Sequence, residues 1–346
     1  MLQKILSHQE FAKKANIPFQ KTSSLVLKKF FVKKTHQILS NSSVKYQNPR
    51  LLDHQKIFSR KFSDENKKEN KFKPVPLGIP GVEHIIAVSS AKGGVGKSTV
   101  AVNLALAFSK MNKKVGILDS DMYGPSIPKL MGTEGSSIMQ NSEQKILPIP
   151  AYNIQTISIG NLIDPKQALI WRGPLVTGTL NQLFRDVEWG ELDILVLDLP
   201  PGTGDTQLTI SQSLQLSGAV IVSTPQDIAL NDAIRGVVMF QKVNVPVIGI
   251  VENMSYYECP KCHHVENIFG SGGAKKMSED MKIDLLGQIP LHTDIRKFSD
   301  EGTPIVEKEP NSSYSKKFME IANKIIKKLD EKKLSKEIEP PKITMK

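Results

Sequence analysis

Short apolar runs bounded by polar residues recur along the middle of the chain, and each has the length of a buried strand. Between several of these runs, apolar residues recur every three or four positions instead, as on one face of a helix. The strand-like runs are "HIIAVSS" (84–90), "KVGILDSD" (114–121), "LDILVLDLP" (192–200), "GAVIVSTP" (218–225) and "VPVIGIVENM" (245–254). The helical stretches include "KSTVAVNLALAFSKM" (97–111) and "DIALNDAIRGVVMFQKV" (227–243). Strands that alternate with helices form right-handed βαβ units, so the pattern predicts an α/β fold with a doubly wound, mostly parallel sheet.

The same pattern predicts how the chain is divided. Residues 83–332 hold the alternation and end in an amphipathic stretch, 313–332, which we expect to be a closing helix. Residues 63–82 are charged and then proline-rich, which is typical of a linker. Before the linker lies a basic segment, 1–62, and after the closing helix a tail, 333–346, that we expect to be disordered.

The charge of the chain is concentrated at its N-terminus. The net charge is +11, and residues 1–60 hold nearly all of the excess positive charge, because Glu10 and Asp53 are the only acidic residues among their lysines and arginines. The folded body is therefore close to neutral, and we expect no nucleic-acid surface on it. The N-terminal segment is acid-poor and rich in Ser, Thr, Asn and Gln. This composition favours import into the mitochondrial matrix, with a disordered basic arm as the alternative.

Two further absences narrow the class of protein. No apolar run in the sequence approaches the roughly 18 residues that cross a bilayer, so no integral membrane association is expected. The two cysteines are too few for a disulfide framework, which favours a reducing compartment.

The segment "SSAKGGVGKSTV" (89–100) predicts a phosphate-binding loop between a strand and a helix. It matches the pattern G-x-x-x-x-G-K-[ST] except that Ala91 stands at the first glycine. Glycines let backbone N–H groups approach phosphate oxygens, the lysine neutralises the β and γ phosphates, and the hydroxyl of the serine is a ligand for Mg²⁺. The residues of the predicted loop are Lys92, Gly93, Gly94, Val95, Gly96, Lys97, Ser98 and Thr99. A plain glycine-rich turn is the alternative.

Carboxylates follow two of the predicted strands. Asp198 ends the run "ILVLD", where strand tips of such sheets deliver a carboxylate toward Mg²⁺. Asp119 and Asp121 follow the second strand in "LDSDMYGPS". Asp119 is expected to support the metal shell. Either of the two could instead be a turn or cap residue.

Both cysteines of the chain lie in "CPKC", as Cys259 and Cys262. Their spacing fits a redox disulfide, the attachment signature of a c-type haem (with His263) and half of a zinc site. The position after a late strand is wrong for a thioredoxin-like motif, and a haem has no evident pocket. A zinc site within one chain would need two more ligands, and the neighbouring histidines are too near Cys262 to complete a tetrahedron easily.

The loop "KGGVGKST" resembles the deviant Walker A loop of the MinD/ParA/Mrp dimeric ATPases. The resemblance implies that Lys92 reaches the nucleotide of a partner subunit, so that two ATP molecules lie between the subunits of a homodimer. It also implies that Asp121 positions the attacking water and that the amide of Gly202 senses the γ-phosphate. By the same analogy Asn253 contacts adenine and Pro290 lies beside the base.

A dimer offers a role for two cysteines, because two chains supply four thiolates, enough for one [4Fe–4S] cluster. The stretch "VENMSYYECPKCHHVENIFGSGG" is similar to that of the Mrp/NUBPL iron–sulfur carriers, and so are "DMYGPSIPKLMG", "WRGPLV" and "LDLPPGTGDTQLTISQ". The resemblance covers roughly residues 80–330 and, with the basic segment, is strongest to the mitochondrial NUBPL branch. It implies an ATPase that carries a cluster to apoproteins, with respiratory complex I as the expected client. The alternatives are a MinD/ParA-like positioning ATPase and a redox or zinc scaffold.

Overall fold

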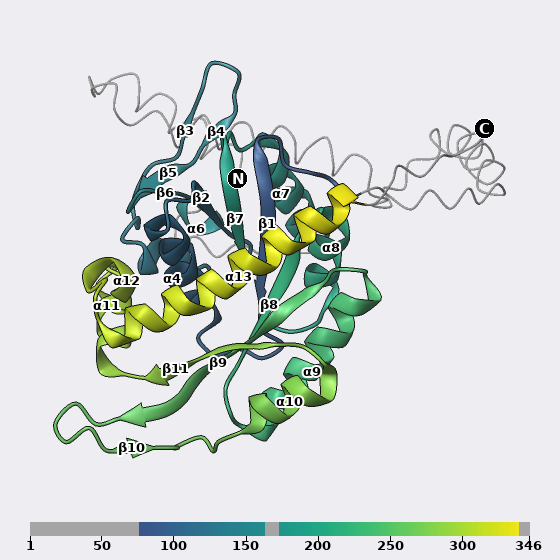
Figure 1. The fold of residues 1–346 in the computed structure, drawn as a ribbon. Helices are drawn as coiled ribbons and strands as arrows, with labels where there is room; N and C mark the ends of the chain where they lie inside the picture. The colour runs from purple at the N-terminus through teal and green to yellow at the C-terminus, as the bar shows by residue number, and fades with distance from the viewer. Residues whose placement is uncertain (1–75, 163–172, 339–346) are drawn as a thin grey trace, which may run out of the picture. The chain divides into compact units, whose positions relative to one another are not determined.

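The computed structural model describes residues 76–162 and 173–338 (Figure 1). The basic segment 1–62 and the residues after 338 lie outside this part. The strands are β1 (Val82–Ser89), β2 (Val115–Asp119), β3 (Met139–Gln140), β4 (Ile146–Leu147), β5 (Ile149–Ala151), β6 (Ile154–Ser158), β7 (Leu192–Asp198), β8 (Gly218–Ser223), β9 (Val247–Glu258), β10 (Val265–Glu266) and β11 (Leu285–Leu291). The helices are α4 (Lys97–Lys110), α5 (Ile127–Leu130), α6 (Ile159–Leu162), α7 (Gly173–Asp186), α8 (Asp205–Ser213), α9 (Asp227–Lys242), α10 (Gly273–Met281), α11 (Thr293–Asp300), α12 (Ile305–Lys308) and α13 (Ser313–Ile338).

One large sheet organises the described residues. Its strand order is β10-β9-β8-β1-β7-β2-β6-β5, and β11 also pairs with β9. All of its pairings are parallel except two at its margins, β10 with β9 and β5 with β6. The predicted doubly wound, mostly parallel sheet is confirmed. The connection from β1 runs through α4 to β2 on one side, whereas the connection from β7 runs through α8 past β1 to β8 on the other side. Folds of this kind bind ligands at the point where the direction of the connections reverses.

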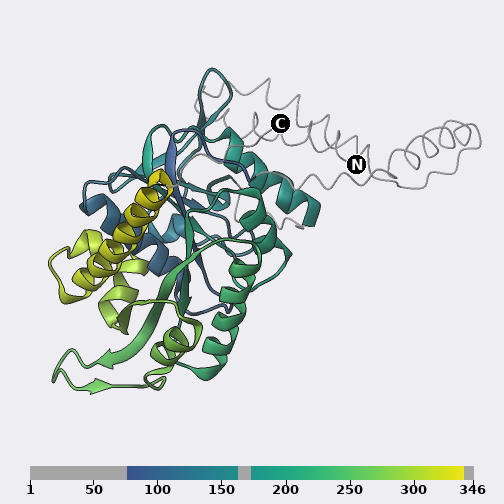
Figure 2. The same cartoon turned by 45° about the vertical axis from the view of Figure 1, so that its right-hand side comes forward.

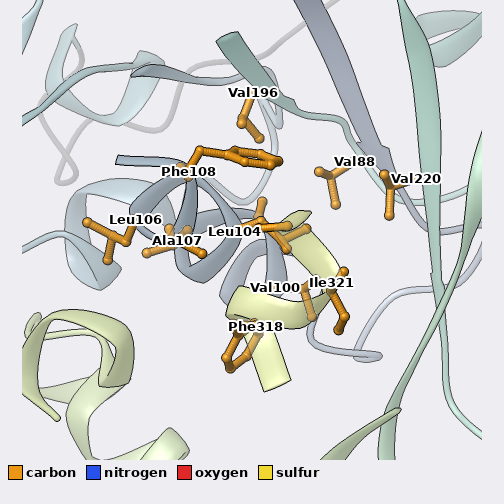
Figure 3. Packing of buried hydrophobic residues seen from close by; sticks show 14 of the residues in the cluster. Val88, Val100, Leu104, Leu106, Ala107, Phe108, Val196, Val220, Phe318 and Ile321 are labelled. Atoms are coloured by element: carbon orange, nitrogen blue, oxygen red, sulfur yellow. The ribbon is translucent and has the colours of Figure 1, made fainter. Parts of the chain in front are cut away.

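Helices cover both faces of the sheet, and the strands supply each face alternately (Figures 1 and 2). In β1, Ile86 and Val88 pack in the same cluster as residues of α4 and α13, whereas Ile85 and Ala87 pack with residues of α7, α8, α9 and α10. This is the two-residue period of a strand that is buried on both faces. Figure 3 shows the first face, where Phe318 on α13 lies among the side chains of α4.

Several elements extend beyond the apolar runs of the sequence. Strand β9 continues to Glu258, next to the first cysteine, and helix α13 continues to Ile338, past the expected end at 332. At the other end, Leu77 forms a bridge with Leu214 and Ile79 is buried, so residues from the predicted linker already contribute to the fold. None of the described helices is both long and apolar enough to cross a membrane.

Replacing Phe318 by alanine tests the packing of α13. The phenyl ring is fully buried in the cluster that α13 shares with α4, so we expect Phe318→Ala to lower the free energy of unfolding by about 3–5 kcal/mol. Urea titration measures this quantity. The control is Lys327→Ala, at an exposed position on the same helix. Equal effects of the two substitutions would contradict the packing.

Candidate functional site

The predicted phosphate loop connects β1 to α4 at the carboxyl edge of the sheet. Gly94 and Gly96 have φ values of 81° and 79°, the left-handed region that favours glycine. A Cβ atom at Gly93 or Gly94 would meet nothing within 4 Å, so this stretch of backbone faces open space. Val95, by contrast, is buried and anchors the loop. The loop therefore presents backbone N–H groups and the N-terminus of α4 to the same space, an arrangement that binds phosphate groups.

Lys97 and Asp198 form a buried ion pair beneath the loop. The Nζ atom of Lys97 donates to Oδ1 of Asp198 at 2.5 Å and to Oγ of Ser98 at 3.2 Å. Lys97 is 6% exposed and Asp198 is fully buried. Burial raises the pKa of the Asp198 carboxyl, and the charge of Lys97 opposes that shift.

The other oxygen of Asp198, Oδ2, is buried and has no hydrogen-bond partner within the described part of the chain. An unpaired buried carboxylate oxygen is costly unless it is satisfied by another group. With the Ser98 hydroxyl beside it, this oxygen matches the hard oxygen ligands that Mg²⁺ takes directly or through water. The residues present therefore fit a Mg²⁺–nucleotide site.

Asp119 lies in register with Asp198 on the neighbouring strand and is fully buried. Its carboxylate accepts hydrogen bonds from the backbone N–H of Asp121 at 3.0 Å and from the Ser158 hydroxyl at 2.9 Å. It also accepts hydrogen bonds from the backbone N–H groups of Ser126 and Ile127, at the start of α5. Burial, together with the nearby Asp198 charge, raises the pKa of Asp119 to about 7. Both oxygens thus accept hydrogen bonds from the turn after β2 or from Ser158, so Asp119 is a turn and cap residue, and its support of a metal shell stays a prediction.

Asp121 keeps part of its carboxylate available. Its Oδ1 atom accepts from the N–H groups of Tyr123 at 3.3 Å and Gly124 at 3.2 Å, and the residue is 8% exposed. Its charge acts on Asp198, so the structure brings the two carboxylates of the prediction into one site. Asp121 is therefore both a turn residue and a group at the edge of the nucleotide site.

Gly202 lies in the loop that follows β7, which we call the switch loop (residues 199–204). Its N–H group donates to the carbonyl oxygen of Ser90 at 2.9 Å, and its φ of 101° is a glycine conformation. The Ser90 hydroxyl in turn donates to the carbonyl oxygen of Lys92, which is half-buried. The predicted γ-phosphate contact and the predicted partner-reaching lysine are thus linked through one serine.

Asn253 lies on β9 and supports the phosphate loop. Its Nδ2 atom donates to the carbonyl oxygen of Val95 at 2.8 Å, and the residue is 6% exposed. A Cβ atom at Gly96 would lie 2.2 Å from this nitrogen. Pro290 is buried and follows Ile289, which pairs with Asn253 across β11 and β9. The two residues expected near the base therefore lie on adjacent strands, and Asn253 has a contact with the phosphate loop that the sequence does not indicate.

The cysteines lie at the tip of a hairpin formed by β9 and β10. The Cys259 N–H donates to the carbonyl oxygen of His264 and the His263 N–H donates to that of Cys259, both at 2.9 Å, which closes the turn. Both thiols are free, Cys259 is half-buried and Cys262 is exposed. The backbone N–H groups of Cys262 and Lys261 hydrogen-bond the Cys259 sulfur and lower the pKa of this thiol. The turn thus favours a thiolate, the form that binds metal.

Comparison with known families shows to which protein family the chain belongs. The family model described as a NUBPL iron-transfer P-loop NTPase matches residues 81–326. The chain belongs to this family. It is 50% identical over 258 residues to the mouse iron-sulfur cluster transfer protein NUBPL, covering 74% of this chain and 81% of that protein. The Escherichia coli iron-sulfur cluster carrier protein is 51% identical over 252 residues, 73% of this chain and 68% of that one.

A plant relative and two solved structures extend the comparison. An Arabidopsis thaliana mitochondrial iron-sulfur protein required for NADH dehydrogenase is 49% identical over 256 residues, 74% of this chain and 82% of that protein. The ADP complex of a nucleotide-binding protein from Archaeoglobus fulgidus has a TM-score of 0.60 at 39% identity, covering 69% of this chain and 93% of that one. The cell division ATPase MinD of Pyrococcus furiosus, with a TM-score of 0.54 at 22% identity over 70% of this chain and 98% of that chain, shows a shared fold alone.

One buried polar residue close to the phosphate loop has no role assigned from the sequence. Gln207, on α8, is 1% exposed and hydrogen-bonds the switch loop. The sequence does indicate that Gln207 is buried, because it precedes the buried Ile210 and Leu214 by three and seven residues and so lies on the apolar face of the helix. A glutamine at such a position needs a polar partner.

Substitution of the loop glycines tests the contact with Asn253. Gly94→Ala and Gly96→Ala both place a side chain at a positive φ, which costs about 1–2 kcal/mol. Only Gly96→Ala also meets the Asn253 amide, so we expect a further loss of about 1–3 kcal/mol of unfolding free energy, measured by urea titration. Asn253→Ala in the same chain should recover part of this further loss. Equal losses for the two glycines would contradict the close approach.

Proposed function

We propose that this protein is an ATP-dependent iron–sulfur carrier that holds a [4Fe–4S] cluster between two copies of the chain and delivers it to apoproteins. The observation that carries the proposal is strand β9, which serves both chemistries. Asn253 on this strand hydrogen-bonds the phosphate loop, and Cys259 follows the strand's last residue. The proposal is supported by this connection, because one strand links the phosphate loop to the hairpin turn that carries both cysteines.

The nucleotide part of the proposal assigns a role to each group. Lys97 neutralises the β and γ phosphates, and Ser98 and Asp198 would hold Mg²⁺. Bound Mg²⁺ would screen the phosphate charge that develops during transfer. Asp121 orients the attacking water, and Lys92 reaches the nucleotide of the partner chain. The roles of Lys97, Ser98 and Asp198 are supported by the open loop backbone and by the unpaired oxygen of Asp198. The role of Asp121 is supported by its electrostatic effect on Asp198, and that of Lys92 by the resemblance of the loop.

The rest of the nucleotide site contacts the two ends of ATP. The Gly202 amide would exchange its hydrogen bond to the Ser90 carbonyl for one to the γ-phosphate of bound ATP. Asn253 and Pro290 lie by the adenine. The placement of Asn253 and Pro290 on neighbouring strands supports a shared role for them.

The cluster part of the proposal rests on the number of ligands. The chain has two cysteines, and a [4Fe–4S] cluster takes four thiolates, so two chains are needed. The hairpin tip supports sharing, because Cys262 is exposed and its turn is open to a second copy. The cluster is cargo, received and passed on, and ATP hydrolysis is slow and coupled to that transfer.

The proposed destination is the mitochondrial matrix, with complex I subunits as clients. The basic, acid-poor segment 1–62 supports import. The Arabidopsis relative is described as a mitochondrial iron-sulfur protein required for NADH dehydrogenase, which is consistent with this destination. The bacterial relatives share the ATPase core, so the basic segment is the feature of this chain that favours the organelle.

Two lysines of the loop should behave differently when replaced by alanine. Lys97→Ala should abolish ATP binding, because the phosphates lose their cation and Asp198 is left as an unpaired buried charge. Lys92→Ala should keep ATP binding and lose hydrolysis, because its target lies in the partner. Calorimetric binding and phosphate release measure the two quantities. ATP binding by Lys97→Ala at parental affinity would contradict the phosphate-loop role.

The reach of Lys92 into the partner is tested by mixing variants. Lys92→Ala and Asp121→Ala chains, each inactive alone, should recover activity at one of the two sites of a mixed dimer. Full inactivity of the mixture, with dimers shown to form, would contradict action between subunits.

Metal content and oligomeric state should change together. After anaerobic reconstitution we expect about one [4Fe–4S] cluster per two chains, by iron and sulfide analysis and by absorption. Removal of the cluster should weaken association, because shared ligands link binding to assembly. Cys259→Ser and Cys262→Ser should lose the cluster and keep ATP binding. Full cluster loading in a strictly monomeric preparation would contradict the shared site.

A further inference from the structure

Gln207 closes the switch loop with two hydrogen bonds from one buried amide. Its Nε2 atom donates to the carbonyl oxygen of Pro200 at 2.7 Å and to the hydroxyl of Ser89 at 2.9 Å. Pro200 lies at the start of the loop, Gln207 lies in the first turn of α8 after it, and Ser89 is the last residue of β1. One side chain therefore fixes the start of the loop to α8 and to the strand that leads into the phosphate loop.

The residues between these two anchors are far less confined. Pro201, Thr203 and Gly204 are exposed, whereas Pro200 and Gln207 are buried. In the middle of the loop, the N–H group of Gly202 hydrogen-bonds the Ser90 carbonyl. The loop thus has fixed ends and an exposed middle, and the glycine amide in its middle is held by a single backbone acceptor.

The Gln207 amide is an uncommon group to bury unless it is used. Burial of a primary amide costs free energy that its hydrogen bonds must offset, and here the Oε1 atom has no partner among the described residues. A leucine or methionine would fill the same space against the apolar residues of α8 at lower cost. The two donors to Pro200 and Ser89 are what the glutamine contributes.

We propose that Gln207 is a positioning residue that sets where the Gly202 amide lies and thereby gives the protein its preference for ATP over ADP. The inference rests on the proposed nucleotide function, in which Gly202 meets the γ-phosphate. Only ATP carries that phosphate, so a displaced amide weakens the binding of ATP and leaves that of ADP unchanged. A purely structural role for Gln207 would lower both affinities together.

Gln207→Met tests this proposal, because methionine keeps the volume and removes both donors. Binding of ADP and of a non-hydrolysable ATP analogue is measured by calorimetry in the presence of Mg²⁺. We expect the ratio of the two affinities to fall roughly tenfold, which corresponds to the loss of one hydrogen bond to a charged group. The control is Gln212→Met, at an exposed position on the same helix, which should keep the parental ratio.

An unchanged ratio in Gln207→Met, or an equal loss of both affinities, would overturn the positioning role. If Gln207→Met does not fold, Gln207→Asn is measured by the same criteria, since its amide is one methylene too short to reach both acceptors. A parent protein that binds neither nucleotide would refute the proposed function itself. A parent that binds both, beside a Gln207 variant with an unchanged ratio, would refute only this inference.

Discussion

The buried ion pair between Lys97 and Asp198 is the constraint on which the rest of the site depends. Two charges without access to water are tolerated only when each is compensated, and removal of one partner from such a pair typically costs about 3–5 kcal/mol. The pair can form because β1 and β7 are adjacent and in register, with Val88 opposite Asp198. The loop after β1 then returns Lys97 above the end of β7.

Strand β9 extends this arrangement to the cysteines. It pairs with β8 on one side and with β11 on the other, so its middle is held as firmly as any strand of the sheet. Its far end leaves the body as a hairpin whose apolar residues Val265 and Ile268 are more than half exposed. The rigid part contacts the phosphate loop and the exposed part carries the thiols. Under the proposed function, this division places the cluster at the surface and the nucleotide at the edge of the core.

The central strands of the sheet could be predicted from the sequence, because they are buried on both faces and appear as continuous apolar runs. The phosphate loop could also be predicted, because its glycines and lysine lie close together in the sequence and form a recognisable motif. Strands β5 and β6 and strand β11 were missed, because they lie at the margins of the sheet and their runs are short or interrupted by proline and glycine. The hydrogen bonds of Asp119 could be predicted only in part. A turn or cap role was one of the two interpretations, and the N–H groups of Asp121, Ser126 and Ile127 follow it closely in the sequence. Ser158 is 39 positions away, and no local pattern brings it near.

The family is shown by residues 81–326, whereas the roles of individual residues depend on geometry. Asn253 illustrates the difference: resemblance implies a contact with adenine, and the structure adds a hydrogen bond to the phosphate loop. The same holds for Gln207, whose motif is part of the resemblance but whose function could only be proposed from its two acceptors.

Whether the Lys97–Asp198 pair forms a Mg²⁺–nucleotide site can be measured with Asp198→Asn. The substitution keeps the shape of the side chain and removes the charge. Calorimetric titration of ATP, with Mg²⁺ and with a chelator, gives the gain in affinity that Mg²⁺ provides. We expect the parent protein to show this gain and folded Asp198→Asn protein to lose it while still binding ATP. An undiminished Mg²⁺ effect in the variant would mean that Asp198 does not take part in a Mg²⁺–nucleotide site.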